Sequence, residues 1–516
     1  MKNTKRHLYN LVINWGGHLA SMVVLFFLSP YIVGKLDASS YGIWTLLNVL
    51  AGYMGIFDMG IRASVGRHIA LYLGKRDSKG VDETIRAGFG FFTLSGLAIL
   101  VVGVLLGWLF PVIFNEVSPE YHGIVRYLLP VMVLNIWLSI VAAIYSSVLT
   151  SLYRFDIARM VDFLVLAART GATVIALESG MGLWGLVLAV LVSNLIGLIG
   201  NRIAAGRLYP GLRSFPFLYS RQRFGELFGY GAFAFISSVS YKIIGQSDLI
   251  LVGILLSVAD VREYNVGAML VYYTMPFIGM ISSTFFPLVQ RKVSSGDLGD
   301  IDGLLHKQIR ISMSAGLVVY IGIAFYAEPF IRLWMLQDGF DRGSVAKAAT
   351  VMAVLALSKL PTLYLGPCAS VLDAMGFVRF NAARAVMEAV VNIAFSIFFV
   401  IVLEWGLAGV AAGTLAARLC VATISVPVFL ARQTRISLTE MASKTLVPGA
   451  AAGGAFAVIC ATAAWVFPPS NWQVFALHLV VLVSLWGLLV TAFILPAHMR
   501  RQLGQILRDR LDAMSS

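Results

Sequence analysis

The sequence predicts an all-α, polytopic membrane protein with about fourteen transmembrane helices. Three observations support this prediction: apolar residues are abundant, they are grouped into long segments, and Lys and Arg are unevenly distributed between the loops. Of the 516 residues, 59% are hydrophobic and only 13% are charged, whereas about a quarter of a soluble domain is charged. Roughly 20 apolar residues cross a bilayer as a helix, so each segment of this length indicates one span.

The apolar segments form two groups of six and a final pair. The fifth and sixth segments are hard to separate, because only Glu178-Ser179-Gly180 makes a turn between them. We expect the first six spans at 9–34, 40–61, 86–110, 123–148, 157–177 and 182–205. The next six are expected at 226–256, 263–288, 308–328, 346–372, 378–403 and 405–430, and the last two at 445–467 and 474–497.

Proline and glycine mark local features within these spans. Proline removes a backbone donor and kinks a helix, so we expect irregularities at Pro30, Pro130, Pro276, Pro287, Pro361, Pro367 and Pro427. Gly409 and Gly413 form a G-x-x-x-G motif in the twelfth span. This motif permits close helix packing, and packing is the role we expect for it.

Basic residues are concentrated in every second loop. These loops and the two ends of the sequence carry 29 of the 39 Lys and Arg residues, and the opposite loops carry six. Because Lys and Arg are retained in the cytoplasm, both termini are predicted to be cytoplasmic. The net charge of +13 would suggest nucleic-acid binding in a soluble protein, but here the orientation effect accounts for it, and no nucleic-acid partner is expected.

The span pattern predicts two lobes. We expect an N-lobe at 1–205, a linker rich in Arg and aromatic residues at 206–225, a C-lobe at 226–431, and the last two helices with a cytoplasmic tail at 432–516. The linker is suited either to the inner membrane surface or to a plain connection with snorkelling Arg side chains. A weak repeat supports the lobes, because segments 36–43 and 258–266 each combine an acidic residue with a Tyr that opens the next helix.

Three local motifs suggest a family. The second span begins with Tyr41-Gly42-Ile43-Trp44 and ends with Asp58-Met59-Gly60-Ile61, followed by Arg67; the seventh contains Asp248-Leu249-Ile250-Leu251-Val252-Gly253. With its span pattern, the sequence resembles the polysaccharide (O-antigen-type) flippases of the multidrug/oligosaccharidyl-lipid/polysaccharide exporter superfamily. The span layout covers the whole sequence, while the motifs cover about a tenth of it and contain no catalytic signature.

The resemblance implies a function in surface-polysaccharide biosynthesis. It implies a two-lobed inner-membrane transporter that moves polyprenyl-pyrophosphate-linked oligosaccharide from the cytoplasmic to the periplasmic leaflet by alternating access. Membrane lipids, a polysaccharide polymerase and chain-length machinery are the further partners to expect. No cofactor is expected. The polysaccharide could be O-antigen, capsule or exopolysaccharide.

Polar and charged side chains inside the spans are the candidate functional residues. An ionisable group near the bilayer centre is costly and usually faces a cavity or a partner. A pyrophosphate cargo needs positive charge, and Arg suits phosphate because of its fork of donors. We therefore predict that a hydrated central cavity binds substrate through Lys242, Arg169, Lys359, Arg418, Arg384, Asn14, Tyr241 and Asn392. Ion coupling or gating is assigned to Asp248, Glu388, Asp58 and His18.

A structural interpretation competes with this one. Arg384 and Glu388, at i and i+4, could neutralise each other, and so could Asp162 and Arg169, which are seven residues apart on one helix face. Asp58 and Arg62 could likewise form a structural ion pair. His18 could be an ordinary hydrogen-bonded interior histidine. Such pairs would hold helices together without contacting any cargo.

Three other functions were weighed. A membrane glycosyltransferase or polymerase is disfavoured because the only formal D-x-D, at Asp300–Asp302, lies in a polar loop, and no P-loop, H-E-x-x-H or G-x-S-x-G occurs; no enzyme activity is expected. A multidrug exporter of the same superfamily would need an acidic cavity for cations. The lipid II flippase branch has charged final helices, which this sequence lacks.

Overall fold

The computed structural model describes nearly all of the chain, and it is helical throughout the described part. The described residues are 2–58, 61–212, 215–220, 224–225, 232–295, 301–337, 339–434 and 436–496. Among them, ten helices are long and apolar enough to cross a membrane, or eleven if α12 and α13, which are bent by 43°, form one span. The chain is therefore a multi-pass membrane protein, and the figure of fourteen spans stays a prediction.

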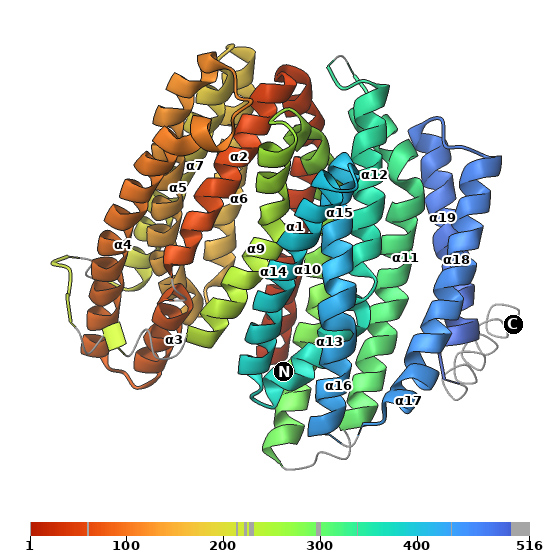
Figure 1. Cartoon of the computed structure of the whole chain (residues 1–516). Helices are drawn as coiled ribbons and strands as arrows, with labels where there is room; N and C mark the ends of the chain where they lie inside the picture. Colours follow the sequence, from red (N-terminus) through yellow and green to blue (C-terminus); the bar gives the residue numbers. More distant parts are fainter. Residues whose placement is uncertain are drawn as a thin grey trace, which may run out of the picture. The chain divides into compact units, whose positions relative to one another are not determined.

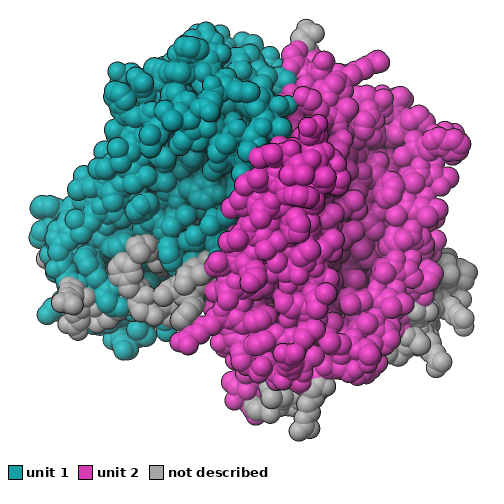
Figure 2. Space-filling view, in the orientation of Figure 1, with its two compact units in different colours: residues 1–262 teal, residues 263–516 magenta. Residues whose placement is uncertain are grey.

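The helices divide into two compact units, residues Met1–Arg262 and Glu263–Ser516 (Figure 2). The boundary lies within α10 (Asp260–Ser294). The region of the predicted seventh span thus belongs to unit 1, where α9 packs against α2. Each unit is described separately below.

Unit 1 contains nine helical elements before α10 (Figure 1) among its described residues. These are α1 (Lys2–Lys35), α2 (Ala38–Met54), the 3-10 helix η1 (Gly55–Asp58), α3 (Ile61–Gly74), α4 (Ser78–Ile113), α5 (Pro119–Ser151), α6 (Phe155–Glu178), α7 (Gly182–Leu208) and α9 (Ala232–Leu255). Helix α5 packs against both α4 and α7, and α6 packs against α7 and α1.

The predicted second span, 40–61, is interrupted. Helix α2 ends at Met54 and is followed by one 3-10 turn, and the loop expected after it instead contains helix α3. Ile61, Val65 and Ile69 recur every four residues along α3 and are completely buried. This spacing forms one apolar face, so the basic segment is an amphipathic helix and not only a loop.

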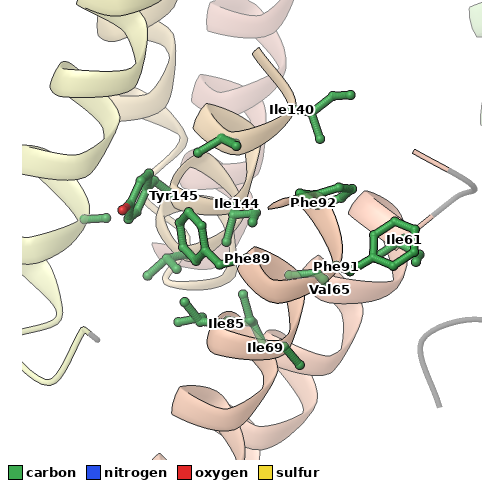
Figure 3. Packing of buried hydrophobic residues seen from close by; sticks show 14 of the residues in the cluster. Ile61, Val65, Ile69, Ile85, Phe89, Phe91, Phe92, Ile140, Ile144 and Tyr145 are labelled. Atoms are coloured by element: carbon green, nitrogen blue, oxygen red, sulfur yellow. The ribbon is translucent and has the colours of Figure 1, made fainter. Parts of the chain in front are cut away.

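The apolar face of α3 forms part of the core of unit 1. Figure 3 shows Ile61, Val65 and Ile69 packed with Phe89 and Ile144, which come from α4 and α5. Burial of such side chains contributes about 1.5–3 kcal/mol each. This core fixes the end of the broken span that carries Asp58.

The Tyr41-Gly42 motif is explained by close packing. A Cβ atom on Gly42 would lie 1.8 Å from the backbone oxygen of Val258, which also belongs to unit 1. No side chain fits there, so glycine allows the start of α2 to approach the turn after α9. Asp37 caps α2 by accepting a hydrogen bond from the Ser40 amide at 2.9 Å.

Unit 2 comprises the rest of α10 and the helices that follow it. These are α11 (Ile301–Met335), α12 (Arg342–Lys359), α13 (Thr362–Ala374), α14 (Val378–Ile401), α15 (Gly406–Ala417), the π-helix η3 (Arg418–Ala422), α16 (Thr423–Gln433), α17 (Leu438–Met441), the π-helix η4 (Ala442–Leu446), α18 (Val447–Val466), α19 (Trp472–Leu489) and the π-helix η5 (Val490–Ile494). Helix α14 packs on α15, and α11 packs on α12 and α18.

Two predicted irregularities in unit 2 have clear physical causes. The tenth span bends at Leu360-Pro361, between α12 and α13. Pro427 lies inside α16 and donates no hydrogen bond to the Thr423 carbonyl, one turn earlier. That oxygen instead accepts a hydrogen bond from the Tyr364 hydroxyl at 3.2 Å, as buried backbone requires where water is absent.

The G-x-x-x-G prediction is confirmed. A Cβ atom on Gly413 would lie 2.2 Å from Ser396 Oγ, and one on Gly409 would lie 3.1 Å from the backbone of Phe399. Both contacts are with α14. The two glycines therefore allow α14 and α15 to pack closely, which positions the polar residues of both helices.

Candidate functional site

The charged residues predicted inside the spans form one polar cluster in each unit. We call the first the α2–α9 cluster; it contains Lys242, Gln246 and Asp248 of α9, the end of α2 from Gly52, and η1 up to Asp58. We call the second the α14 cluster; it contains Arg384, Glu388, Arg418, Lys359 and Tyr272.

Lys242 contacts the end of α2. Its ammonium group donates a hydrogen bond to the Gly52 carbonyl, two residues before α2 ends. The helix C-terminus carries partial negative charge and favours a cation. A Cβ atom on Gly55 would lie 3.0 Å from Lys242 Nζ, and one on Gly52 would lie 3.4 Å from Gln246 Oε1. The absence of side chains on both glycines thus allows α9 to present these polar groups to the α2 backbone.

Asp248 is the buried acid of this cluster. It is only 1% exposed. It lies six residues after Lys242 along α9.

Asp58 forms an ion pair with Arg62. This is the structural alternative to the gating role predicted for Asp58. One carboxylate oxygen accepts a hydrogen bond from the Arg62 backbone amide at 3.0 Å. The other accepts hydrogen bonds from the Arg62 side chain, from Nε at 3.2 Å and from Nη2 at 3.1 Å. Such a fork is geometrically specific. Asp58 thus fixes the start of α3, and its carboxylate is already occupied by Arg62.

The remaining predicted residues of unit 1 are less well placed for a common site. Arg169 is exposed on α6. The expected partner of Arg169, Asp162, accepts a hydrogen bond from Arg159 Nη1 at 3.0 Å, a pair at i and i+3 that the sequence analysis did not weigh. Asn14, His18 and Tyr241 lie on helices α1 and α9, but their side chains fall outside the described part of the chain.

Glu388 lies at the centre of the α14 cluster. Its Oε1 accepts Arg418 Nε at 2.9 Å, and its Oε2 accepts Arg384 Nη1. The side chains of all three residues are less than a tenth exposed. The expected Arg384–Glu388 pair is confirmed, and Arg418 adds a second arginine from another helix.

Lys359 and Arg418 each lie at a break in their own helix. Arg418 opens the π-helix η3, and π-bulges are frequent at functional sites. Its Nη1 lies 3.4 Å from the Ser358 carbonyl, next to Lys359, which ends α12 before the bend. Lys359 is 3% exposed, and its ammonium lies 5.1 Å from the centre of the Tyr272 ring, a cation–π geometry.

The other polar residues of α14 bond to neighbouring helices. Asn392 Nδ2 donates to Thr414 Oγ1 at 2.8 Å, and Ser396 Oγ donates to the Val410 carbonyl at 3.3 Å. Asn381 Nδ2 donates to Asp373 Oδ1 at 2.8 Å. This polar stripe therefore links α14 to α13 and α15, which is the packing role that competed with substrate binding.

The α14 cluster carries an excess of positive charge. The cluster contains three basic side chains and one acid: Arg384 and Arg418 bond to Glu388, and Lys359 packs on the Tyr272 ring. Counting Asp373, which bonds to Asn381, still leaves one net positive charge. Buried charges need compensation, so the cluster has the sign that attracts an anion. Within the described residues, no group of three or more His, Cys, Asp or Glu is arranged to hold a metal ion.

Several contributing residues were missed by the sequence analysis. Gly52, Gly55, Gln246, Ser358 and Tyr272 are ordinary residues of apolar helices. The G-x-x-G spacing of Gly52 and Gly55 was the one available signal. The contact of Tyr272 with Lys359 spans 87 positions of sequence, and no local pattern encodes it.

Comparisons with known proteins identify the family and the fold. Residues 36–338 match a family model described as polysaccharide biosynthesis protein. The chain is 24% identical to the "probable low-salt glycan biosynthesis flippase Agl15" of Haloferax volcanii, over 74% of each protein. It is 19% identical to the "putative O-antigen transporter" of Shigella flexneri, over 64% of this chain and 77% of that protein.

A solved structure shows the same architecture. The lipid II flippase MurJ in its inward closed conformation superposes with a TM-score of 0.67, over 94% of this chain and 98% of that one, at 14% sequence identity. At this identity the likeness concerns the fold. The family match covers more than half of the chain.

Proposed function

We propose that this chain, which belongs to the polysaccharide biosynthesis protein family, is a flippase for polyprenyl-pyrophosphate-linked oligosaccharide. It moves this cargo from the cytoplasmic to the periplasmic leaflet of the inner membrane by alternating access. The observation that carries the proposal is that three basic residues with buried side chains, Arg384, Arg418 and Lys359, gather in the α14 cluster with the single acid Glu388. Relatives named as a glycan flippase and an O-antigen transporter support the same cargo class.

The charge of the cargo explains the charge of the cluster. A pyrophosphate carries negative charge, and an isolated ion near the bilayer centre costs several kcal/mol. Arg384 and Arg418 present guanidinium groups whose donors match phosphate oxygens. Lys359 adds a compact cation at the end of α12. Together they offset the cargo charge while it crosses.

The acids have different roles in this proposal. Both oxygens of Glu388 and both of Asp58 already accept hydrogen bonds from arginine side chains or backbone. We assign these two acids to positioning the cations. Asp248, which is buried on α9, stays the candidate for ion coupling. With no nucleotide-binding motif in the sequence, transport is driven by an ion gradient, the membrane potential or downhill cargo movement.

The topology is part of the proposal. Fourteen spans with both termini in the cytoplasm place the basic loops on the side from which the cargo is loaded. A polysaccharide polymerase and chain-length machinery are the partners that act on the product. The net charge argues against the multidrug-exporter alternative, because a cationic drug would meet a site of the same sign.

Reconstituted vesicles test the function. A fluorescent polyprenyl-pyrophosphate oligosaccharide should become accessible in the opposite leaflet with wild-type protein, and the same lipid with an uncharged headgroup should cross at least about tenfold more slowly. Lys359→Gln should slow the charged cargo, whereas Arg432→Gln, at an exposed position near the end of α16, should not. Equal rates for charged and uncharged lipids would refute an anion-selective site.

A further inference from the structure

A second cationic site lies in unit 2, away from the α14 cluster. A pocket of about 690 Å³ opens between α11 and the end of the C-terminal helices, with Lys307, Arg310 and Ser314 on one side and Val490 and Leu495 on the other. Figure 1 shows α11 beside α18 and α19, and α11 also packs against η5. Pockets of this size hold drug-sized groups.

One face of α11 supplies the polar wall. Lys307, Arg310 and Ser314 follow each other at helical spacing, three and four residues apart, so their side chains lie in one row. Ile311 joins this row as an apolar lining residue. Lys307 and Arg310 thus place two cations at one end of this wall. Beyond them, Ile311 makes it more apolar.

The pocket is built by fixed contacts. Arg310 Nη2 donates to the Lys444 carbonyl of η4 at 3.1 Å, and Trp486 Nε1 of α19 donates to the Ser314 carbonyl at 2.7 Å. Arg310 Nε is a buried donor without a hydrogen-bond partner among the described residues. A buried donor of this kind is costly, so it is suited to an acceptor from outside the described residues.

Two acids of unit 2 lie near the segments that line the pocket. Asp302, on the first turn of α11, lies 3.0 Å from His306 Nδ1. Glu440 of α17 forms an ion pair with Lys444. Among the described lining residues, Lys307 and Arg310 are the charged ones and no acid is present. The pocket combines this positive end with an apolar wall, which matches an anionic headgroup attached to an acyl chain.

We propose that this pocket binds an anionic glycerophospholipid of the surrounding bilayer. The phosphate accepts hydrogen bonds from Arg310 and Lys307, and an acyl chain lies along Ile311, Val490 and Leu495. Basic pockets between helices on the cytoplasmic side are suited to such lipids, and the charge distribution assigns Lys307 and Arg310 to that side. Apart from these cations, only Ser314 offers a polar side chain, too few groups to bind an oligosaccharide, so we assign the pocket to a phospholipid and not to the cargo.

Native mass spectrometry of the purified full-length protein tests this proposal, with phosphatidylglycerol and phosphatidylcholine as probes. Wild-type protein should retain phosphatidylglycerol preferentially, and Lys307→Gln with Arg310→Gln should lower that affinity about tenfold. Ile311→Trp, which fills the pocket without altering charge, should also release the lipid. Arg432→Gln should retain it.

Two controls keep the result decisive. Lys307→Gln alone changes an exposed side chain and should still weaken phosphatidylglycerol binding several-fold if Arg310→Gln disturbs folding. Unchanged phosphatidylglycerol retention in all three pocket variants would overturn the proposal. Displacement of phosphatidylglycerol by an equal concentration of polyprenyl phosphate would also overturn it, by assigning the pocket to the carrier lipid of the cargo.

Discussion

Arg418 and Glu388 lie thirty positions apart in the sequence, and their side chains meet at 2.9 Å inside unit 2. Arg384 occupies the second oxygen of the same carboxylate. The triad joins α14 to η3 and concentrates two guanidinium groups around one acid. Because removing one member of a buried ion pair strands the charge of another, this contact affects both stability and the charge of the site.

Glu388→Gln should destabilise unit 2 by about 3–5 kcal/mol, because two buried arginines lose their counter-ion. Thermal unfolding in detergent measures the effect. Glu440→Gln is the matched control, since Glu440 forms an exposed i,i+4 pair with Lys444, and it should leave the melting temperature unchanged. Equal melting temperatures for wild type and Glu388→Gln would show that the triad does not support the fold.

Lys242→Glu should abolish surface polysaccharide while the protein still inserts in the membrane. The substitution places a negative charge against the Gly52 carbonyl at the C-terminus of α2, where the helix favours a cation. Polysaccharide on the cell surface and the abundance of the protein in membranes are the two measurements. Lys75→Glu, on an exposed turn after α3, should behave as wild type. Normal polymer output from inserted Lys242→Glu would exclude a role in transport.

Gly413→Leu should disrupt the contact between α15 and α14. Even a Cβ atom there would lie 2.2 Å from Ser396 Oγ and 2.7 Å from the Ser396 amide nitrogen, so the helices must separate. Overpacking of this kind costs about 1–3 kcal/mol or more. Gly454→Leu in α18 is the control, because nothing lies within 4 Å of its Cβ position. A melting temperature for Gly413→Leu equal to that of Gly454→Leu would contradict the packing role.

Asp37 should contribute a pH-dependent part of the stability of unit 1. Burial raises the pKa of Asp37, but hydrogen bonds from Ser40 and Ser39 outweigh this, and the net pKa lies below its usual value. The stabilisation is therefore present above about pH 4 and lost as the pH falls through the lowered pKa.

Asp37→Asn keeps an N-cap but removes the charge. Wild type should exceed it in melting temperature at neutral pH, and the difference should shrink below about pH 4. Asp37→Ala should be less stable at both pH values by about 1 kcal/mol, because the cap of α2 is lost. A difference between wild type and Asp37→Asn that grows on acidification would contradict the lowered pKa.

Local patterns predicted the elements well and their contacts poorly. The i,i+4 spacing of Arg384 and Glu388 identified a pair that the structure contains, and the G-x-x-x-G motif identified the packing of Gly413. The same logic did not find the Asp162–Arg159 pair. Adjacent turns of one helix offer several partners, and spacing alone does not choose between them.

The composition and periodicity of the sequence determined that this is a helical multi-pass membrane protein, because the length of each apolar segment is set by the thickness of the bilayer. The sequence also predicted which basic residues lie inside spans. Only the tertiary structure decided that Arg418 bonds to Glu388, that Lys359 packs on Tyr272, and that Lys242 contacts the end of α2. Those contacts join separate helices, so they depend on how the helices pack and on where they break.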